Sequence, residues 1–177
     1  MEQFTFFWQN FLSQWASSDF VINEIEYNCA EQYMMAEKAR LFNDQKTLDM
    51  IMESSDPSEQ KSLGRLVEDF DDKIWSEDDE NGRPRCWNIV WCGNMAKFSQ
   101  SESHLIKLFE TKGTTLVEAS PYDLRWGVGL KRSNPLINNR SNWLGLNWLG
   151  EVLTSVREFL LVDKTPYLST KDKRAPV

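Results

Sequence analysis

The sequence predicts a single, helix-rich α+β domain with a few short strands. Several segments carry the 3.6-residue apolar repeat of a helix packed on a core, whereas only two short segments have the β-branched, alternating pattern of a strand. The chain has 177 residues, of which 41% are hydrophobic and 12% aromatic. Such a chain is long enough and apolar enough to build one core.

The first expected elements are a short strand or hairpin and a helix that follows it directly. "FVINEIEYN" alternates and contains β-branched residues, which is typical of strand structure over residues 20–27. "NCAEQYMMAEKARLF" then predicts an amphipathic helix that begins at Asn28, with Met34 and Met35 on its apolar face. Asn28 and Glu31 have the N-cap and N3 spacing of a capping box, which supports that start.

The remaining elements are expected from their start and stop signals and from their apolar periods. They are a helix from Asp56 through Phe70, a helix over residues 101–112 closed by Gly113, a strand over residues 114–120 and an amphipathic helix over residues 145–161. Residues 120–143 are rich in turn formers and carry no period. Loops of that length in compact domains are often functional.

Glu31 and Lys38 lie one heptad apart within the apolar face of the helix that begins at Asn28. Two structural explanations are available: Glu31 completes a capping box, and Lys38 packs its aliphatic stem on the apolar face while its ammonium reaches water. The functional alternative rests on spacing, because seven residues separate the two Cα atoms by roughly 10 Å along the helix axis. A ligand of the size of a sugar fits between such side chains.

A second group of candidates follows the strand expected over residues 114–120. In "VEASPYDLRWGVG", Glu118 ends the strand, Asp123 lies in the loop, Trp126 offers a flat face, and Gly127 permits close backbone approach. Trp126 is equally explained by core packing, and Asp123 by an Asx turn. Carboxylates beside a sugar can handle protons or stabilise an oxocarbenium-like transition state.

The composition excludes several classes of site. His104 is the single histidine and the three cysteines have no metal-ligand spacing, so we expect no histidine triad, no zinc site and no cofactor. The net charge of −7 predicts a weak nonspecific grip on polyanions, and the acidic residues between Glu68 and Glu80 are expected in a solvated loop. The absence of a signal peptide pattern and of a membrane-spanning apolar run predicts a cytoplasmic protein that does not bind membranes.

Several motifs occur in a characteristic order: "FLSQW", "YNCAEQYMMAEKA", "GR" at Gly64-Arg65, "MAKFSQ", "LVEAS", "WGVG" and "GLNWLGEVLTSVRE". In this order they resemble the NADAR family, which includes the YbiA-like N-glycosidases. The residues "SQW" are more similar to the branch of the family that acts on ADP-ribosylated guanine. The resemblance covers Phe7 to Leu161. It implies an N-glycosidase domain over residues 1–161, and residues 162–177 are expected to form a polar tail.

The resemblance implies hydrolysis of an N-glycosidic bond to ribose without a metal or other cofactor. Relatives are credited with removing ADP-ribose from ADP-ribosylated guanine and with cleaving phosphoribosyl aminopyrimidine intermediates of riboflavin synthesis, and the first activity is the expectation here. The expected partners are an ADP-ribose-containing substrate, such as modified DNA or RNA, and an ADP-ribosyltransferase toxin whose modification the protein reverses. A module that binds ADP-ribose without cleaving it is a further alternative, since it would use the same pocket.

The resemblance also assigns roles to individual residues. Lys38 is the expected nucleophile, which forms a Schiff base with the opened ribose, and Glu31 and Asp123 are the expected acid/base or charge-stabilising groups. Trp15 is expected either to stack on a base or to pack in the core, while Arg157 and Lys97 are candidates for phosphate contacts or for structural ion pairs. The other expected substrate contacts are Ser13, Gln14, Glu118, Trp126, Gly127, and Asn147 and Gly150, whose backbone N–H groups are expected to meet phosphate at the start of the last helix.

Overall fold

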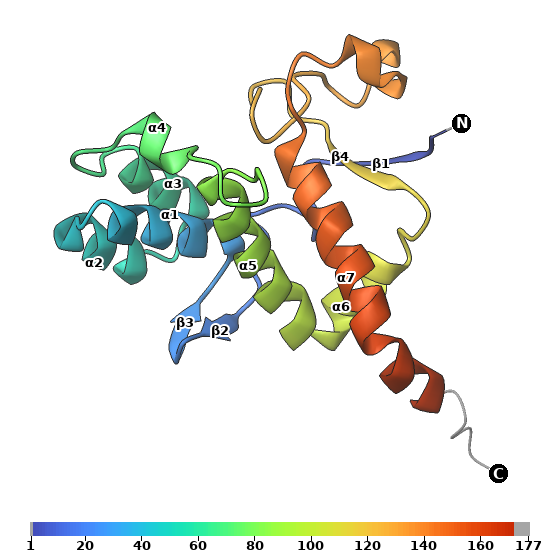
Figure 1. Ribbon diagram of the computed structural model, residues 1–177, viewed down its shortest axis with the longest axis horizontal. Helices are drawn as coiled ribbons and strands as arrows, with labels where there is room; N and C mark the ends of the chain where they lie inside the picture. Colours follow the sequence, from blue (N-terminus) through green and yellow to red (C-terminus); the bar gives the residue numbers. More distant parts are fainter. Residues whose placement is uncertain (1, 172–177) are drawn as a thin grey trace.

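The computed structural model describes the backbone of residues 2–171 and the side chains of residues 2–163 (Figure 1). Its helices are α1 (Ala30–Leu41), α2 (Gln45–Glu53), α3 (Pro57–Gly64), α4 (Asp72–Trp75), α5 (Arg85–Gln100), α6 (Glu102–Phe109) and α7 (Trp148–Lys171). Its strands are β1 (Phe4–Phe7), β2 (Phe20–Ile22), β3 (Ile25–Tyr27) and β4 (Thr115–Glu118). The predicted fold class, a helix-rich α+β domain with a few short strands, is confirmed.

The elements form two groups that helix α5 joins. Helices α1 to α4 gather on one side of the molecule, while β1, β4 and α7 lie on the other (Figure 1). Strand β1 runs parallel to β4, with Phe7 opposite Glu118, and α7 packs against β4. Helix α5 packs against both α1 and α7, so one continuous apolar core runs through both groups.

Helix α1 differs from its prediction in where it begins and in how much of it is buried. Its N-cap is Cys29, whose Sγ accepts a hydrogen bond from the backbone N–H of Gln32, and Gln32 Oε1 accepts one from the N–H of Asn28 at 2.8 Å. The capping arrangement is therefore shifted by one residue and does not use the side chain of Glu31. Eight of the twelve residues of α1 are buried, because α2 and α3 pack on one side of it and α5 on another.

The ends of three helices differ most from the sequence predictions. Helix α3 ends at Gly64 rather than at Phe70, with Arg65 as its C-cap, and Gly64 lies against the side chain of Met35, too close for a Cβ atom. Helix α6 ends at Phe109, and Gly113, with φ of 85°, lies in the turn that follows. Helix α7 continues past Leu161 to Lys171, through part of the segment expected as a tail, and residues 172–177 lie outside the described residues.

The sequence analysis did not predict β1, α2, α4 or α5, and α4 lies within the acidic segment that was expected to be a solvated loop. Strand β1 has the sequence FTFF, whose consecutive aromatic residues obscure the alternation of a strand. Helix α5 lies between α1 and α7, so its apolar residues are spread around the helix and form no single stripe. The hairpin of β2 and β3 is present where residues 20–27 predicted it. Within residues 2–171, no helix combines the length and the apolarity needed to cross a membrane.

Candidate active site

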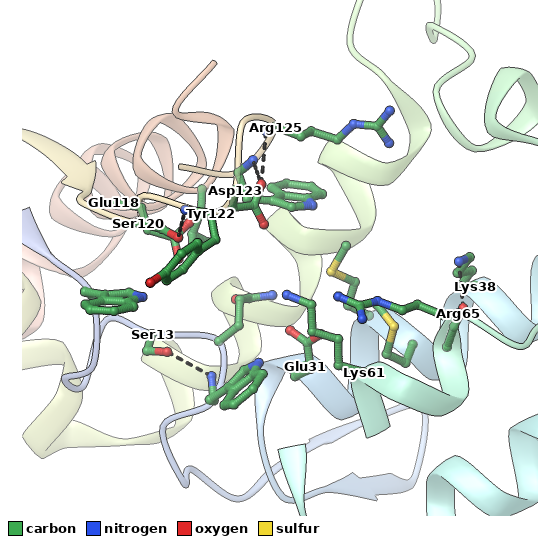
Figure 2. Close-up of a pocket in the computed structure, with 18 of the residues that line it drawn as sticks. Ser13, Glu31, Lys38, Lys61, Arg65, Glu118, Ser120, Tyr122, Asp123 and Arg125 are labelled. Atoms are coloured by element: carbon green, nitrogen blue, oxygen red, sulfur yellow. Dashed lines mark hydrogen bonds between the residues drawn. The ribbon is translucent and has the colours of Figure 1, made fainter. Parts of the chain in front are cut away.

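A cleft of about 1050 Å³ lies between the two groups of elements (Figure 2). The loop after β1 forms one wall with residues 8–16, and α1 forms the floor. Residues of α3 and α4 and of the turn between them form the second wall. The loop after β4, residues 118–126, covers the third side. Segments distant in the sequence therefore contribute to one concave surface large enough for a nucleotide-sized ligand.

Glu31 lies in the first turn of α1, and its carboxyl group faces the cleft (Figure 2). The backbone N–H of Glu31 donates to the carbonyl oxygen of Gln14 at 3.0 Å, which ties α1 to the loop after β1. The residue is 5% exposed. Burial raises its pKa to about 7, although the positive charge of Lys61 acts in the opposite direction. A carboxyl group with that pKa can both give and take a proton at neutral pH.

Glu118 and Asp123 bring two further carboxyl groups to the same part of the cleft. Glu118 ends β4, its Oε2 has no hydrogen-bond partner, and burial followed by the charge of Asp123 raises its pKa to about 8. Asp123 Oδ1 accepts hydrogen bonds from the N–H groups of Arg125 and Trp126 at 3.0 and 2.7 Å. The Asx turn expected as the structural alternative is thus present, and it fixes the Asp123 carboxyl group beside the other two.

Lys38 lies at the opposite end of the cleft from this carboxyl group cluster. Its Nζ donates to the carbonyl oxygen of Gly64 at 2.6 Å and lies 3.8 Å from the centroid of the Phe70 ring. Burial lowers its pKa, and the charges that act on it are those of Asp72, Arg125 and Arg65. Figure 2 shows Arg65 between Lys38 and Glu31, so the heptad spacing places both residues in one cleft but not in contact.

An ion pair joins the two sides of the cleft near Lys38. Arg125 donates to both carboxylate oxygens of Asp72 at 2.9 and 3.0 Å. Asp72 opens helix α4, and Arg125 belongs to the loop after β4. Because the two side chains are 57% and 36% exposed, the pair contributes little to stability and mainly sets the positions of the two segments.

Four other predicted contact residues line the cleft: Ser13, Gln14, Trp15 and Trp126. Gln14 is 8% exposed, its Oε1 accepts from Asn94, and its Nε2 has no partner. Trp15 is 43% exposed, so it lies at the mouth of the cleft and not in the core. Trp126 is partly buried and meets Trp148 edge to face. Of the two explanations offered for Trp15, stacking on a ligand therefore fits its position.

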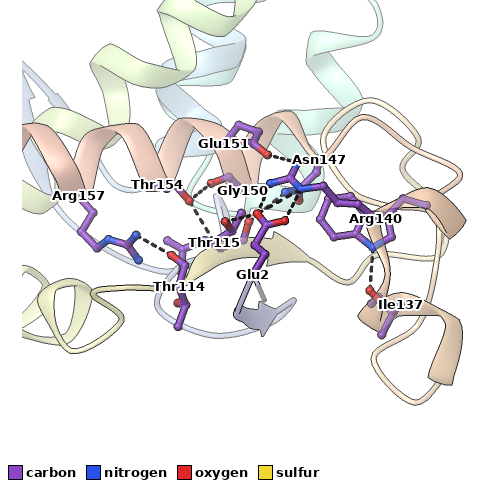
Figure 3. A network of polar contacts seen from close by, with 12 residues as sticks. Glu2, Thr114, Thr115, Ile137, Arg140, Asn147, Gly150, Glu151, Thr154 and Arg157 are labelled. Carbon is purple, nitrogen blue, oxygen red and sulfur yellow. Dashed lines mark hydrogen bonds and ion pairs between the residues drawn. The ribbon is translucent and has the colours of Figure 1, made fainter.

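Asn147, Gly150 and Gly127 do not line the cleft, and the start of α7 has other partners than phosphate. The N–H groups of Asn147, Trp148 and Leu149 donate to carbonyl oxygens of residues 125–127. The side-chain amide of Asn147 bonds both Leu116 and Glu118 of β4, and Gly150 lies so close to Leu116 that a Cβ atom would clash (Figure 3). These contacts hold the loop and the strand together. The expected phosphate contacts of Asn147 and Gly150 and the expected substrate contact of Gly127 stay predictions.

Arg157 and Lys97 are buried away from the cleft lining. Arg157 donates to the carbonyl oxygens of Thr111 and Thr114 at 2.7 and 2.6 Å and pairs with Glu158, so it takes the structural one of its two expected roles. Lys97 Nζ donates to the carbonyl oxygen of Ser13 at 2.8 Å, and burial lowers its pKa to about 7. Lys97 supports the cleft wall from behind.

The cleft contains polar and aromatic residues that the sequence analysis did not assign: Trp8, Lys61, Arg65, Asp72, Ser120, Tyr122 and Arg125. Lys61 and Arg65 are four residues apart around the end of α3, which places two cations on one face. The four-residue spacing of Lys61 and Arg65, together with the Gly64-Arg65 motif, is the sequence pattern from which these two cleft residues could have been predicted. Among residues 2–163, no group of three or more His, Cys, Asp or Glu side chains is arranged to hold a metal ion.

Comparison with known proteins gives a family and several relatives. The model of the NADAR domain family matches residues 5–161. The chain is 43% identical over 133 residues to N-glycosidase R617 of Acanthamoeba polyphaga mimivirus, covering 75% of this chain and 74% of the viral protein. It is 38% identical over 138 residues to Protein irg-1 of Caenorhabditis elegans, covering 77% of this chain and 62% of the worm protein.

Two more distant comparisons extend the series. The chain is 28% identical over 134 residues to the chloroplastic riboflavin biosynthesis protein PYRR of Zea mays, which covers 74% of this chain but 19% of the plant protein. The NMR structure of the E. coli protein YbiA superposes with a TM-score of 0.67 at 22% identity, covering 93% of this chain and 89% of YbiA. At that identity the likeness shows a shared fold.

Proposed function

The chain belongs to the NADAR domain family, and we propose that it is an N-glycosidase that removes ADP-ribose from ADP-ribosylated guanine. The N-glycosidase activity is supported by family membership and by the viral relative named for it. The observation that carries the proposal is the cleft itself, which gathers three carboxyl groups beside Lys61 at one end and places Lys38 and Arg125 at the other. A ribose with a negatively charged phosphate on one side has the complementary distribution of charge.

The carboxyl group cluster supplies the chemistry that cleavage of an N-glycosidic bond requires. Positive charge develops on the ribose C1 atom, and the leaving base nitrogen gains a proton. Glu31, with a pKa raised to about 7 by burial, is suited to deliver or accept that proton. Asp123 lies beside it, where a carboxylate lowers the energy of an oxocarbenium-like ribose.

The other end of the cleft supports a phosphate-bearing substrate. Lys38 lies there, Arg125 lies across the cleft from it, and Arg65 extends from the same wall toward Glu31, so the charges of both arginines act on Lys38 (Figure 2). Arginine and lysine are the side chains that bind phosphate in proteins, arginine through paired hydrogen bonds and lysine as a point charge. The diphosphate of ADP-ribose, next to its ribose, fits this arrangement.

A lysine amine completes the proposed reaction. The neutral amine attacks the ribose C1 atom, the bond from C1 to the guanine nitrogen breaks, and guanine leaves with a proton from a carboxyl group. The ribose ring then opens to a Schiff base as its ring oxygen takes a proton, and water hydrolyses the C=N bond to release ADP-ribose. The resemblance to the NADAR family assigns this amine to Lys38.

A second candidate substrate is a phosphoribosyl aminopyrimidine intermediate of riboflavin synthesis. The relative from Zea mays is named for riboflavin biosynthesis, and such an intermediate also carries a ribose between a base and a phosphate. The exposed Trp15 favours the larger substrate, because a stacking face at the mouth of the cleft is suited to a base that belongs to an oligonucleotide.

Mass spectrometry of the products tests the proposal. The protein and its Glu31→Gln variant are incubated with an oligonucleotide that carries ADP-ribosylated guanine. We expect release of ADP-ribose and restored guanine by the protein and strongly reduced release by the variant. If the protein releases nothing from this substrate but cleaves the aminopyrimidine, the second candidate replaces the first. Tight binding of ADP-ribose in calorimetry, with no cleavage of either compound, would identify a binding module.

A further inference from the structure

We propose that Lys61, and not Lys38, provides the amine that attacks the ribose; this inference rests on the function proposed above. Lys61 lies in α3 and lines the cleft at the carboxyl group cluster, whereas Lys38 lies at the basic end. The two lysines therefore have different roles. Lys61 forms the transient covalent bond, and Lys38 holds the phosphate group with Arg65 and Arg125.

The contacts of Lys38 fit a charge-holding role. An amine must lose its proton before it can act as a nucleophile. The ammonium of Lys38 donates to the carbonyl oxygen of Gly64 at 2.6 Å and lies 3.8 Å above the Phe70 ring. Both contacts favour the charged form, against the burial that lowers the pKa of this amine. The carboxyl group nearest to it electrostatically is Asp72, which is already paired with Arg125.

The contacts of Lys61 leave its amine available. Within residues 2–163 its Nζ has neither a hydrogen bond nor an ion pair, and its recorded neighbour is the Trp15 ring, with the centroid at 5.8 Å. Figure 2 shows the side chain beside Glu31. Lys61 is also the basic residue whose charge acts most strongly on the pKa of Glu31, and it acts on that of Glu118 as well.

The order of groups along the cleft places the ribose in reach of Lys61. Arg65 acts electrostatically on both Glu31 and Lys38, so it lies between the carboxyl group cluster and the basic end. A phosphate bound by Lys38, Arg65 and Arg125 leaves the attached ribose beside Lys61 and Glu31. The base then extends toward the exposed Trp15 at the mouth of the cleft.

The proposed step balances with groups already in the cleft. A carboxylate of the cluster removes a proton from the Lys61 ammonium, the amine bonds to ribose C1, and the bond from C1 to the base nitrogen breaks. The base leaves with a proton from Glu31. A carboxylate of the cluster then takes a proton from the bonded nitrogen, and the ring oxygen gains a proton as its bond to C1 breaks, which opens the ribose and gives a protonated C=N bond to Lys61. Water hydrolyses this bond to ADP-ribose and the free amine with no change of oxidation state.

Reductive trapping identifies the lysine that reacts. The full-length protein is mixed with an oligonucleotide that carries ADP-ribosylated guanine, and sodium cyanoborohydride is added to reduce the C=N bond to a stable amine. Peptide mass spectrometry then locates the adduct. We expect the ADP-ribosyl adduct on Lys61 in the protein and in a Lys38→Ala variant. An adduct on Lys38 would overturn the inference.

Turnover of matched variants gives an independent readout. Lys61→Arg keeps the positive charge, but its guanidinium stays protonated and cannot form a Schiff base. We expect kcat to fall on the order of 10³-fold in both Lys61→Arg and Lys61→Ala. Lys38→Ala should raise KM by about 10- to 100-fold through loss of a charged hydrogen bond, and Lys38→Arg, which keeps the charge, should raise KM less. Lys46→Arg, on the exposed surface of α2, is the control for a remote lysine.

The failures of the two proposals are distinguishable. If Lys61→Arg turns over at the rate of the unmodified protein, the inference about Lys61 is wrong although the N-glycosidase activity stands. If the unmodified protein cleaves no N-glycosidic bond, the proposed function itself is wrong. Circular dichroism of each variant confirms that a lost activity does not come from a lost fold.

Discussion

Glu2 and Glu118 lie at opposite ends of strand β4, and the surroundings of their two carboxyl groups shift the pKa in opposite directions. Glu2 accepts hydrogen bonds from Arg140 and from Thr115, each at 2.7 Å, and chiefly the Arg140 bond lowers its pKa to about 2 (Figure 3). Glu118 ends the strand in the cleft, where its Oε2 has no partner and burial raises its pKa to about 8.

The contrast extends to the neighbours of each carboxyl group. Around Glu2, Arg140 also pairs with Glu151 at 2.8 Å. In the cleft, Gln14 Nε2 and Glu118 Oε2 are two of the four buried, unpartnered side-chain polar atoms of the described residues. Because such atoms cost free energy, their concentration indicates a site where a ligand supplies the missing partners.

The largest effect that tests this contrast is expected for Glu31→Gln. The variant keeps the shape of the side chain but removes proton transfer, so kcat should fall about 10²- to 10⁴-fold. The pH profile of kcat should lose an inflection near the pKa of about 7 that burial gives Glu31. Single-turnover release of ADP-ribose measures both. Unchanged kcat in a correctly folded variant would remove Glu31 from the reaction.

The next effect concerns Asn147, whose side chain bonds two backbone groups of β4. Asn147→Ala leaves the carbonyl oxygen of Leu116 and the N–H of Glu118 without partners and places alanine at a φ of 56°. We expect the free energy of unfolding to fall by about 2–4 kcal/mol, as measured by urea denaturation. Asn138→Ala, at an exposed site, is the matched control and should change it by less than about 0.5 kcal/mol. A loss of activity without a loss of stability would argue against the scaffold role.

A pH dependence separates the two glutamates further. The pKa of Glu118 is raised from 4.5 to about 8, so the unfolded state releases this proton first as the pH rises. The folded protein should therefore lose stability between about pH 4.5 and 8, and Glu118→Gln should remove this loss. Urea denaturation at several pH values measures the difference between the two proteins, which should grow with pH up to about 8. A constant difference would mean that the carboxyl group is not desolvated.

Glu2→Gln should give the smallest effect and the opposite sign. The ionised form of Glu2 is stabilised by Arg140, so its contribution is present above a pH of about 4.5 and is lost as the pH falls toward about 2. Because the side chain is 42% exposed, solvent screening limits the loss in the variant to about 1 kcal/mol or less at neutral pH. Thermal unfolding at pH 7 and at pH 3 detects the change.

The sequence predicted which carboxyl groups share the cleft but not how the basic residues are distributed along it. Glu31, Asp123 and Glu118 each occur in a recognisable motif next to a helix start or a strand end, and such local signals survive folding. Asn147 and Arg157 also occur in motifs and were expected to bind substrate like the three carboxyl groups. A polar residue in a motif does not reveal whether its partners are backbone groups or a ligand. Lys61 was missed because its relation to Glu31 depends on how α3 packs against α1, and no local pattern encodes that contact.

The loop after β4 is closed at its base, and this closure separates its two parts. Val128 O accepts from Leu144 and Gly145, and Leu124 O accepts from Leu146, so residues 124–128 and 144–149 run side by side. Residues 129–143 therefore leave and return at one fixed point, and lengthening such a segment adds little closure entropy. Because none of residues 129–143 lines the cleft, we expect a change of length in this segment to leave the acidic side chains of the cleft in place.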